Sequence, residues 1–286
     1  MRVRSFGHWS IRYKLLLLFL LLGIMTFAAT GTIAYIKNLR ALKQDIMNQL
    51  AGVRRSKAAQ FEAYYRTIQM HALTLSEDRM VIDAMKEFRT AYRKLDAQPI
   101  PAELREAVLR DYRSRFYPDL QKLGLARPSV EDYLPVEPAA LRLQYDYIAK
   151  NPYTDQQHRR AMESAGDASD YSRLHAKYHR LFRRICEFFG YYDLYLIDYE
   201  TARAVYDVNK DHDFATNLRD GPYREINLAK VVRLCLATDN ADDVFFSDFE
   251  PYEASRGEPT QWVASPIFDG PGATGDTGPA ALERRH

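Results

Sequence analysis

The chain has 286 residues, of which 27% are charged and 47% hydrophobic, a composition typical of a folded protein. Its formal net charge is only +2 and no basic patch stands out, which argues against nucleic acid as a partner. Tyrosine is abundant, with 20 residues, and suits pockets that need an apolar ring with a polar tip.

An uncharged apolar run, LLLLFLLLGIMTFAATGTIAYI, occupies residues 15–36 between Lys14 and Lys37. At about 1.5 Å per helical residue, its length exceeds the roughly 30 Å hydrocarbon core of a bilayer. We therefore predict a transmembrane helix over residues 15–36. The alternative is a cleaved signal peptide, whose apolar region is normally about 7–15 residues long. An uncleaved anchor is favoured because this run is longer and its small residues make a poor cleavage site.

Basic residues flank the run unequally. Four of them and no acid come before it: Arg2, Arg4, Arg12 and Lys14. Three come after it before the first acid: Lys37, Arg40 and Lys43. The excess on the N-terminal side favours a cytoplasmic segment at residues 1–14 and an extracytoplasmic location for the bulk of the chain. The expected protein is single-pass, with the lipid bilayer as its first partner.

A helical pattern follows the anchor from Lys37 to about Leu95. Apolar residues recur in it mostly at spacings of three or four, or at multiples of these: Leu39, Leu42, Ile46, Leu50, Val53, Phe61, Tyr64, Ile68 and Leu75. Such a stripe needs another helix to pack against, from the same chain or from a second copy. Intrachain packing is the simpler interpretation, and a homodimer through this helix is left open.

Further helices are predicted over Ala102–Leu123, Pro138–Lys150, Tyr171–Phe189 and Glu225–Ala237. Strand-like segments, rich in aromatic and β-branched residues, are Tyr192–Asp198, Ala202–Val208, Val244–Phe249 and Thr260–Phe268. This order predicts an α+β fold in which helices flank an antiparallel sheet. We expect a long-helix region at residues 37–190 and a sheet domain at 191–269. The Gly/Pro-rich residues 270–286 lack apolar periodicity and are predicted to form a disordered tail.

Several blocks resemble a known family in the right order. They are YHRLFRRICEFFGYYDLYLID (178–198), VYDVNKDHDFATNLRDGPY (205–223), DFEPY (248–252) and SPIFDG (265–270), with weaker matches at 54–88 and 143–152. They resemble the extracytoplasmic sensor region of bacterial methyl-accepting chemotaxis proteins and of related sensor histidine kinases and nucleotide cyclases. Those regions carry Cache-type, PAS-like ligand-binding domains. The resemblance implies a signal-transducing receptor in the bacterial inner membrane, with a periplasmic sensor for a small molecule.

The chain also departs from that pattern. The usual Thr-Gly of the hairpin turn is Thr201-Ala202, and a proline usual after Tyr-His is Arg180. In such receptors the SPIFDG block is followed by another strand, a second membrane helix and a signalling domain. The chain therefore resembles a truncated receptor whose sheet lacks its last strand. The alternatives are the sensor of a histidine kinase or cyclase, and a stand-alone membrane-anchored binding protein without signalling output.

No catalytic signature is present: there is no P-loop, GxSxG, HExxH, CxxC or dinucleotide-binding glycine pattern. The chain is therefore not predicted to be an enzyme, and no cofactor is implied. The only candidate catalytic groups are scattered carboxylates, which we expect on the solvated surface: Asp193, Asp198, Asp207, Asp211 and Asp213.

Two pairs of residues suggest a metal site or a disulfide, but each pair also has a simpler interpretation. His175 and His179 lie four apart on a predicted helix, but two histidines do not complete a zinc site, and structural hydrogen bonds to the nearby sheet are expected. Cys186 and Cys235 are compatible with a disulfide outside the cytoplasm or with buried free thiols, and the sequence leaves both open.

A ligand pocket is the better functional hypothesis. The resemblance implies a small ligand between the sheet face and the neighbouring loops or helix. The polar and aromatic residues expected there are Tyr206, Tyr223, Arg224, Asn227, Asp248, Tyr252 and Trp262. Arg224 is suited to pairing with a carboxylate, and Tyr252 with Trp262 to enclosing an apolar or cationic group. The competing interpretation places Tyr206 and Trp262 in the core and Arg224 in solvent.

Overall fold

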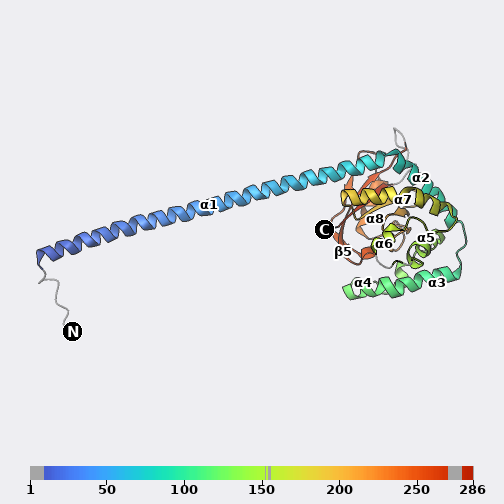
Figure 1. Ribbon diagram of the computed structural model, residues 1–286, viewed down its shortest axis with the longest axis horizontal. Coiled ribbons are helices and arrows are strands. Elements are labelled where there is room, and N and C mark those ends of the chain that lie inside the picture. The colour runs from blue at the N-terminus through green and yellow to red at the C-terminus, as the bar shows by residue number, and fades with distance from the viewer. Residues whose placement is uncertain (1–9, 152, 154–155, 270–278, 286) are drawn as a thin grey trace. The chain divides into compact units, whose positions relative to one another are not determined.

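A computed structural model describes residues 10–151, 153, 156–269 and 279–285. The chain divides into two compact units with the boundary between Tyr65 and Arg66. The first unit consists of the greater part of helix α1 (Ile11–Glu77), and the second holds the last turns of α1 and all other elements (Figure 1). The α+β class expected from the sequence is confirmed.

Helix α1 contains the predicted anchor. Among the described residues it is the one helix long and apolar enough to cross a membrane. It ends at Glu77, because Asp78 adopts an extended backbone and its Oδ1 accepts a hydrogen bond from the N–H of Met80, 2.8 Å away, as the N-cap of the next helix. The expectation of one continuous helix to about Leu95 is therefore wrong at this residue.

The other helices lie close to their predicted positions (Figure 1). Their bounds are α2 (Arg79–Asp96), α3 (Ala102–Asp111), α4 (Tyr117–Leu123), α5 (Pro138–Gln144), α6 (Gln156–Ala161), α7 (Asp170–Phe189) and α8 (Asn227–Leu236). A π-helical turn, η2 (Tyr112–Phe116), joins α3 to α4, and another, η4 (Tyr145–Ala149), extends α5. The predicted helices at 102–123 and 138–150 therefore each contain one π-helical turn.

The sheet is antiparallel throughout. Its strands are β1 (Asp193–Ile197), β2 (Ala204–Asp207), β3 (Phe245–Phe246), β4 (Glu250–Tyr252), β5 (Glu258–Pro266) and β6 (Pro279–Arg285). Their order is β2-β1-β6-β5-β3, with β4 paired to β5. Side chains of β1 alternate between two cores, as the pleat of a strand requires. Leu194 and Leu196 face the core beneath α2 and α7, whereas Tyr195 and Ile197 face the core beneath α8.

Strand β6 corrects two expectations. The sheet does not lack a last strand, and residues 279–285 are not a disordered tail, because β6 lies between β1 and β5 with backbone pairs from Pro266↔Pro279 to Thr260↔Arg285. The segment PAALERR has no β-branched or aromatic residue, so its own propensity gives no sign of a strand. Backbone pairing with β1 on one side and with β5 on the other stabilises the extended conformation instead. Residues 270–278, also assigned to the tail, lie outside the described residues.

The central position of β6 predicts that proline there damages the sheet. Leu282→Pro removes the N–H of a residue that pairs with Leu194 on one side and Val263 on the other. We expect it to lower the free energy of unfolding by at least about 2 kcal/mol, since it leaves buried backbone groups unpaired. Urea unfolding of the detergent-solubilised chain, followed by the fluorescence of buried Trp262, measures this. Leu282→Val, which keeps the N–H, is the control, and equal stability of the two variants would contradict a central β6.

Candidate functional site

A polar loop lies entirely inside the folded body. Residues 208–216, VNKDHDFAT, directly follow β2, and every one of them is buried. Two non-glycine residues of the loop, Lys210 and Ala215, have left-handed backbones with φ of 57° and 66°. Such conformations persist only where surrounding contacts enforce them, and they concentrate at ligand sites and switches.

Helices from both sides hold the loop through its carbonyl groups. The hydroxyl of Tyr112 and the side-chain amide of Gln144 donate to the carbonyl of His212 at 2.8 and 2.9 Å. The same amide donates to the carbonyl of Phe214 at 2.9 Å, and the hydroxyl of Tyr92 donates to that of Ala215 at 2.8 Å. These buried bonds satisfy a backbone that has no regular secondary structure of its own.

Two aspartates at the neighbouring ends of β1 and β2 form the first part of the site. Asp193 Oδ1 accepts hydrogen bonds from the N–H groups of Leu194, Val208 and Asn209 at 2.7, 2.9 and 3.2 Å. Asp207 Oδ1 accepts from the N–H of Lys210. Asp207 Oδ2 and the side-chain oxygen of Asn209 are buried and accept no hydrogen bond from the described part of the chain.

Asp213 forms the second part of the site, among aromatic residues. The hydroxyl of Tyr195 lies 3.1 Å from both carboxylate oxygens of Asp213, and the hydroxyl of Tyr252 donates to Oδ2. The indole ring of Trp262 lies against both tyrosines, with ring centroids 5.0 and 5.4 Å apart. Its Nε1–H is buried and has no hydrogen-bond acceptor among the described residues.

Lys210 occupies the opposite side of the loop, against α7. Its Nζ donates to the carbonyl of Val208 at 3.0 Å and lies 3.4 Å from His179 Nε2. Burial, together with the charge of Lys210, lowers the pKa of His179 to about 2, so the imidazole is neutral. Its Nε2–H donates to the carbonyl of Arg160, and its Nδ1 accepts from the hydroxyl of Tyr206, both at 2.7 Å. The structural role predicted for His179 beside the sheet is therefore confirmed.

Acidic groups outnumber basic ones in this region. Five carboxylates with at most 5% exposure lie on or against the loop: Asp111, Asp193, Asp207, Asp211 and Asp213. The buried cations are Lys210 and Arg159, and Arg159 Nη2 pairs with Asp211 Oδ1 at 3.0 Å. Asp111 pairs with the partly exposed Arg115 and with His212 Nε2, which is 3.2 Å away. We refer to these carboxylates, with Lys210 and Arg159, as the acidic cluster.

Burial shifts four groups of the acidic cluster, Asp193, Asp207, Asp213 and Lys210, towards their neutral forms. Burial, with the charge of Asp211, raises the pKa of Asp193 to about 8. Burial raises the pKa of Asp213 to about 7, although the hydrogen bond from Tyr252 opposes this. Burial next to Asp193 and Asp213 raises the pKa of Asp207 well above its ordinary value, and burial lowers the pKa of Lys210 to about 7. The expectation of solvated surface groups is wrong for all five carboxylates, because each is at most 3% exposed: Asp193, Asp198, Asp207, Asp211 and Asp213.

The residues predicted to line a pocket are only partly brought together. Tyr252 and Trp262 lie at Asp213, and buried Tyr206 bonds to His179. Tyr223 is buried in the same core as Trp262, with its hydroxyl close enough to Tyr112 to influence the pKa of that residue.

The other three predicted residues lie away from the acidic cluster. Asn227 is buried and donates to the carbonyl of Thr260 at 2.6 Å, so it fixes the start of α8 against β5. Arg224 is exposed, with its Nε 3.5 Å from Glu225 Oε1, and Asp248 is exposed. The proposed carboxylate-pairing role of Arg224 therefore has no connection to Tyr252 or Trp262.

Sequence reasoning missed the polar residues of the loop as site residues. The run KDHD at 210–213 follows a predicted strand and reads as an ordinary solvated turn. Its closeness to Asp193, Tyr195 and Arg159 depends on chain segments far away in sequence. The sequence feature that does indicate a site is the unusual density of charged residues directly after an apolar strand.

His175 Nδ1 donates to the carbonyl of Glu163 at 2.7 Å, and its Nε2 has no hydrogen-bond partner in the described part of the chain, so the bond to the sheet expected for His175 does not form. Cys186 and Cys235 are both buried, and neither forms a disulfide within the described residues. The described residues contain no group of three or more potential metal ligands.

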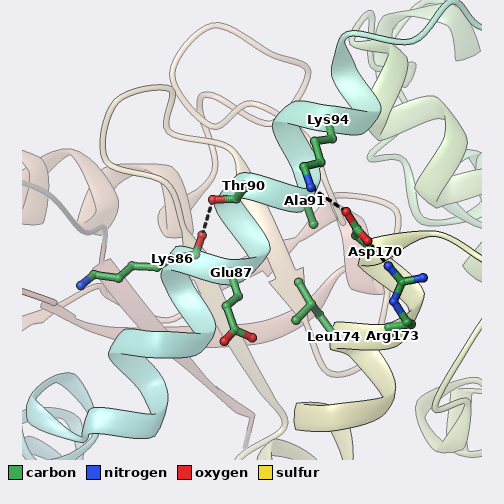
Figure 2. A pocket seen from close by; sticks show the side chains of 8 residues that line it. All are labelled: Lys86, Glu87, Thr90, Ala91, Lys94, Asp170, Arg173 and Leu174. Carbon is green, nitrogen blue, oxygen red and sulfur yellow. Dashed lines mark hydrogen bonds and ion pairs between the residues drawn. The ribbon is translucent and has the colours of Figure 1, made fainter.

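A groove of about 340 Å³ between α2 and α7 is a second candidate. Figure 2 shows Lys94 directed towards Asp170, with Arg173 on the other side of the same carboxylate. Lys94 Nζ lies 2.7 Å from Asp170 Oδ2, and Lys177 Nζ lies 2.9 Å from Glu87 Oε2. Because these charges neutralise one another, the groove offers a ligand less unpaired charge than the acidic cluster does.

Comparisons of the chain with protein-family models, with curated proteins and with solved structures found no match.

The protonation of Asp213 predicts a specific pH dependence. Between about pH 4 and pH 7 this carboxyl is protonated in the fold and ionised in the unfolded chain, so its contribution to stability falls as pH rises. The expected loss is up to about 1.4 kcal/mol per pH unit over that window. Asp213→Asn removes this dependence, because the amide does not titrate. Urea unfolding at pH 5 and pH 7 measures the difference.

The matched control for this prediction is Glu225→Gln, which changes an exposed carboxylate. We expect it to leave the pH dependence of the wild type unaltered. If Asp213→Asn and the wild type lose equal stability between pH 5 and pH 7, Asp213 is not protonated in the fold.

Proposed function

We propose that the chain is the ligand-sensing region of a membrane-anchored receptor of the chemoreceptor type, with a small cationic ligand bound at the acidic cluster. In this proposal α1 crosses the bacterial inner membrane once and the folded body lies in the periplasm. The observation that carries the proposal is the buried excess of carboxylates, together with two buried oxygens, Asp207 Oδ2 and Asn209 Oδ1, that receive no hydrogen bond within the described chain.

The class of ligand follows from these two oxygen atoms. Once Asp207 is ionised, both can only accept hydrogen bonds, so the group that satisfies them must donate. A positive charge on that group is favoured by Asp193, Asp207 and Asp213, which burial now keeps from ionising. An ammonium group supplies both the donors and the charge. Tyr195, Tyr252 and Trp262 add aromatic faces, which attract cations.

Proton release couples the ligand to the protein. A cation that arrives next to protonated carboxyls lowers their pKa, so that they ionise and pair with it. The free-energy cost of burying their charge is then offset by the ion pair. Binding should consequently be tighter where the carboxyls lose their protons readily, towards pH 8.

A short path of contacts connects the acidic cluster to α1. The hydroxyl of Tyr192 donates to Asp211 Oδ2 at 3.3 Å, and the hydroxyl of the adjacent Tyr191 lies 3.0 Å from Nδ1 of His71, on the last turns of α1. The side chain of Ser76, also on α1, is bonded to Ser265 of β5 at 3.1 Å. A ligand that binds two arrangements of the loop unequally can therefore bias the position of the end of α1.

The proposal predicts that small ammonium compounds stabilise the folded chain. We expect ethanolamine and methylammonium at millimolar concentration to raise the Tm of the detergent-solubilised chain at pH 8, because they bind the fold and not the unfolded chain. Acetate at the same concentration should have no effect. Differential scanning fluorimetry provides the measurement.

Two variants localise the effect. Asp207→Asn removes the charge and should abolish the rise in Tm, whereas Asp248→Asn, an exposed carboxylate, should preserve it. A rise that survives Asp207→Asn, or no rise with any cationic compound, would contradict binding at the acidic cluster.

A further inference from the structure

Three arginines lie where α6 contacts α7. Arg159 and Arg160 belong to α6, and Arg183 lies on α7 four residues after His179, on the same face of that helix. His179 joins the two helices, because its Nε2–H donates to the carbonyl of Arg160 at 2.7 Å. We refer to Arg159, Arg160 and Arg183 as the arginine cluster.

Donor groups of all three side chains lack an acceptor. Four buried nitrogens donate no hydrogen bond to a described residue: Nε of Arg159, Nε and Nη2 of Arg160, and Nε of Arg183. Arg159 is only 8% exposed, so water does not replace a protein acceptor at its Nε. Buried donors are nearly always paired in folded proteins, because an unpaired one costs free energy. Four of them in one place indicate a ligand that accepts hydrogen bonds.

The neighbouring carboxylates do not neutralise the arginine cluster. Asp211 Oδ1 pairs with Arg159 Nη2 at 3.0 Å, so one carboxylate offsets one of the three cations. Arg183 Nε lies 3.7 Å from Oε1 of the half-exposed Glu187, which is too long for a hydrogen bond. Arg160 forms no ion pair with a described residue. The cluster therefore keeps a positive charge that the described chain does not balance.

Lys210 places a further basic group on the inner side of the cluster. Its Nζ lies 3.4 Å from His179 Nε2, the same nitrogen that bonds to α6. Burial is the main cause of the low pKa of both groups, and the charge of Arg183 lowers both further. The charge of Arg159 adds to this at Lys210, and that of Arg160 at His179. The three arginines are thus close enough to the same two groups to repel protons from them.

The free nitrogens define the class of ligand. Nε and Nη2 form one edge of the Arg160 guanidinium group, and such an edge binds two oxygens of an anion side by side. A guanidinium group stays charged in proteins, so the cluster cannot become neutral by losing protons. A carboxylate provides two oxygens and one charge, which leaves part of the cluster unpaired. A phosphate or sulfate dianion provides four oxygens and two charges.

We propose that the arginine cluster binds a small tetrahedral oxyanion, phosphate or sulfate, between α6 and α7. The bidentate edge of Arg160 holds two of its oxygens, and the Nε groups of Arg159 and Arg183 donate to the others. Because the four nitrogens are buried, the site suits a small free ion better than the headgroup of a lipid. The bound ion joins α6 to α7 and offsets the repulsion among the three arginines. This inference does not depend on the cation proposed for the acidic cluster.

Inorganic phosphate added to the detergent-solubilised full chain tests the proposal. At pH 8 we expect millimolar sodium phosphate or sodium sulfate to raise the Tm, because the ion binds the fold and not the unfolded chain. Sodium acetate at equal ionic strength should not raise it. Arg160→Gln removes the bidentate edge and should weaken phosphate binding at least about tenfold, measured by isothermal titration calorimetry.

The matched control is Arg180→Gln, which makes the same change of charge at an exposed residue of α7. We expect it to keep the affinity of the wild type for phosphate within about twofold, since surface charges act weakly through water. Ethanolamine reports on the acidic cluster and phosphate on the arginine cluster, so either proposal can fail while the other holds.

Arg160→Gln also has an expected effect in phosphate-free buffer. The substitution removes an unpaired cation next to Arg159 and Arg183, so the Tm should stay the same or rise. This measurement separates a ligand site from a structural role, in which loss of Arg160 would lower the Tm.

Four results would overturn the inference. The first is no rise in Tm with phosphate or sulfate beyond that with acetate. The second is a rise that Arg160→Gln retains in full, which would be a general effect of these salts on folded proteins. The third is equal weakening of phosphate binding by Arg160→Gln and Arg180→Gln. The fourth is a lower Tm of Arg160→Gln without phosphate, which would show that Arg160 is already paired in the fold.

Discussion

The structure depends on the burial of a charged loop. Residues 208–216 place Lys210, Asp211 and Asp213 where water does not reach them, and the surrounding helices contribute hydroxyl and amide donors to hold the loop backbone. Removing carboxylates from water costs free energy that close-packed neighbours do not recover by themselves. The fold reduces this cost by favouring the protonated forms of Asp193, Asp207 and Asp213.

The rest of the folded body positions this loop. Strands β1 and β2 bring Asp193 and Asp207 to its start, and β5 supplies Trp262 beside Asp213. Strand β6 joins the β1–β2 hairpin to β5 and so makes one continuous sheet of these contributions. The contacts of His71 and Ser76 then connect the sheet to the last turns of α1. A continuous set of strand pairs and hydrogen bonds therefore joins the loop to the last turns of α1.

The elements with a strong local signal could be predicted from the sequence. The apolar run at 15–36, the helical pattern at Tyr171–Phe189 and the hairpin strands around Tyr195 and Tyr206 all form where their periodicity indicates. Strand β6 could not be predicted, because Ala280, Ala281 and Leu282 have little preference for a strand, and pairing with β1 and β5 decides their conformation.

The candidate site was harder to predict than the fold, for a physical reason. Tyr252 and Trp262 were expected at a pocket because the family resemblance implies a ligand beside the sheet, but Asp207, Lys210 and Asp213 look like solvated turn residues until their neighbours are known. Arg224 was expected either to pair with a ligand carboxylate or to lie in solvent, and it lies in solvent beside Glu225. Burial is a tertiary property, and a local sequence pattern does not contain it.

The central claim is that a cation and protons compete for the acidic cluster. Isothermal titration calorimetry of the full chain with ethanolamine at pH 7, in two buffers with different ionisation enthalpies, counts the protons exchanged on binding. The account predicts net release of protons, seen as a heat of binding that changes with the buffer, and a smaller release in Asp213→Asn, in which only Asp193 and Asp207 remain to ionise. Binding with the same heat in both buffers would show that the carboxyls do not ionise for the ligand and would contradict the account.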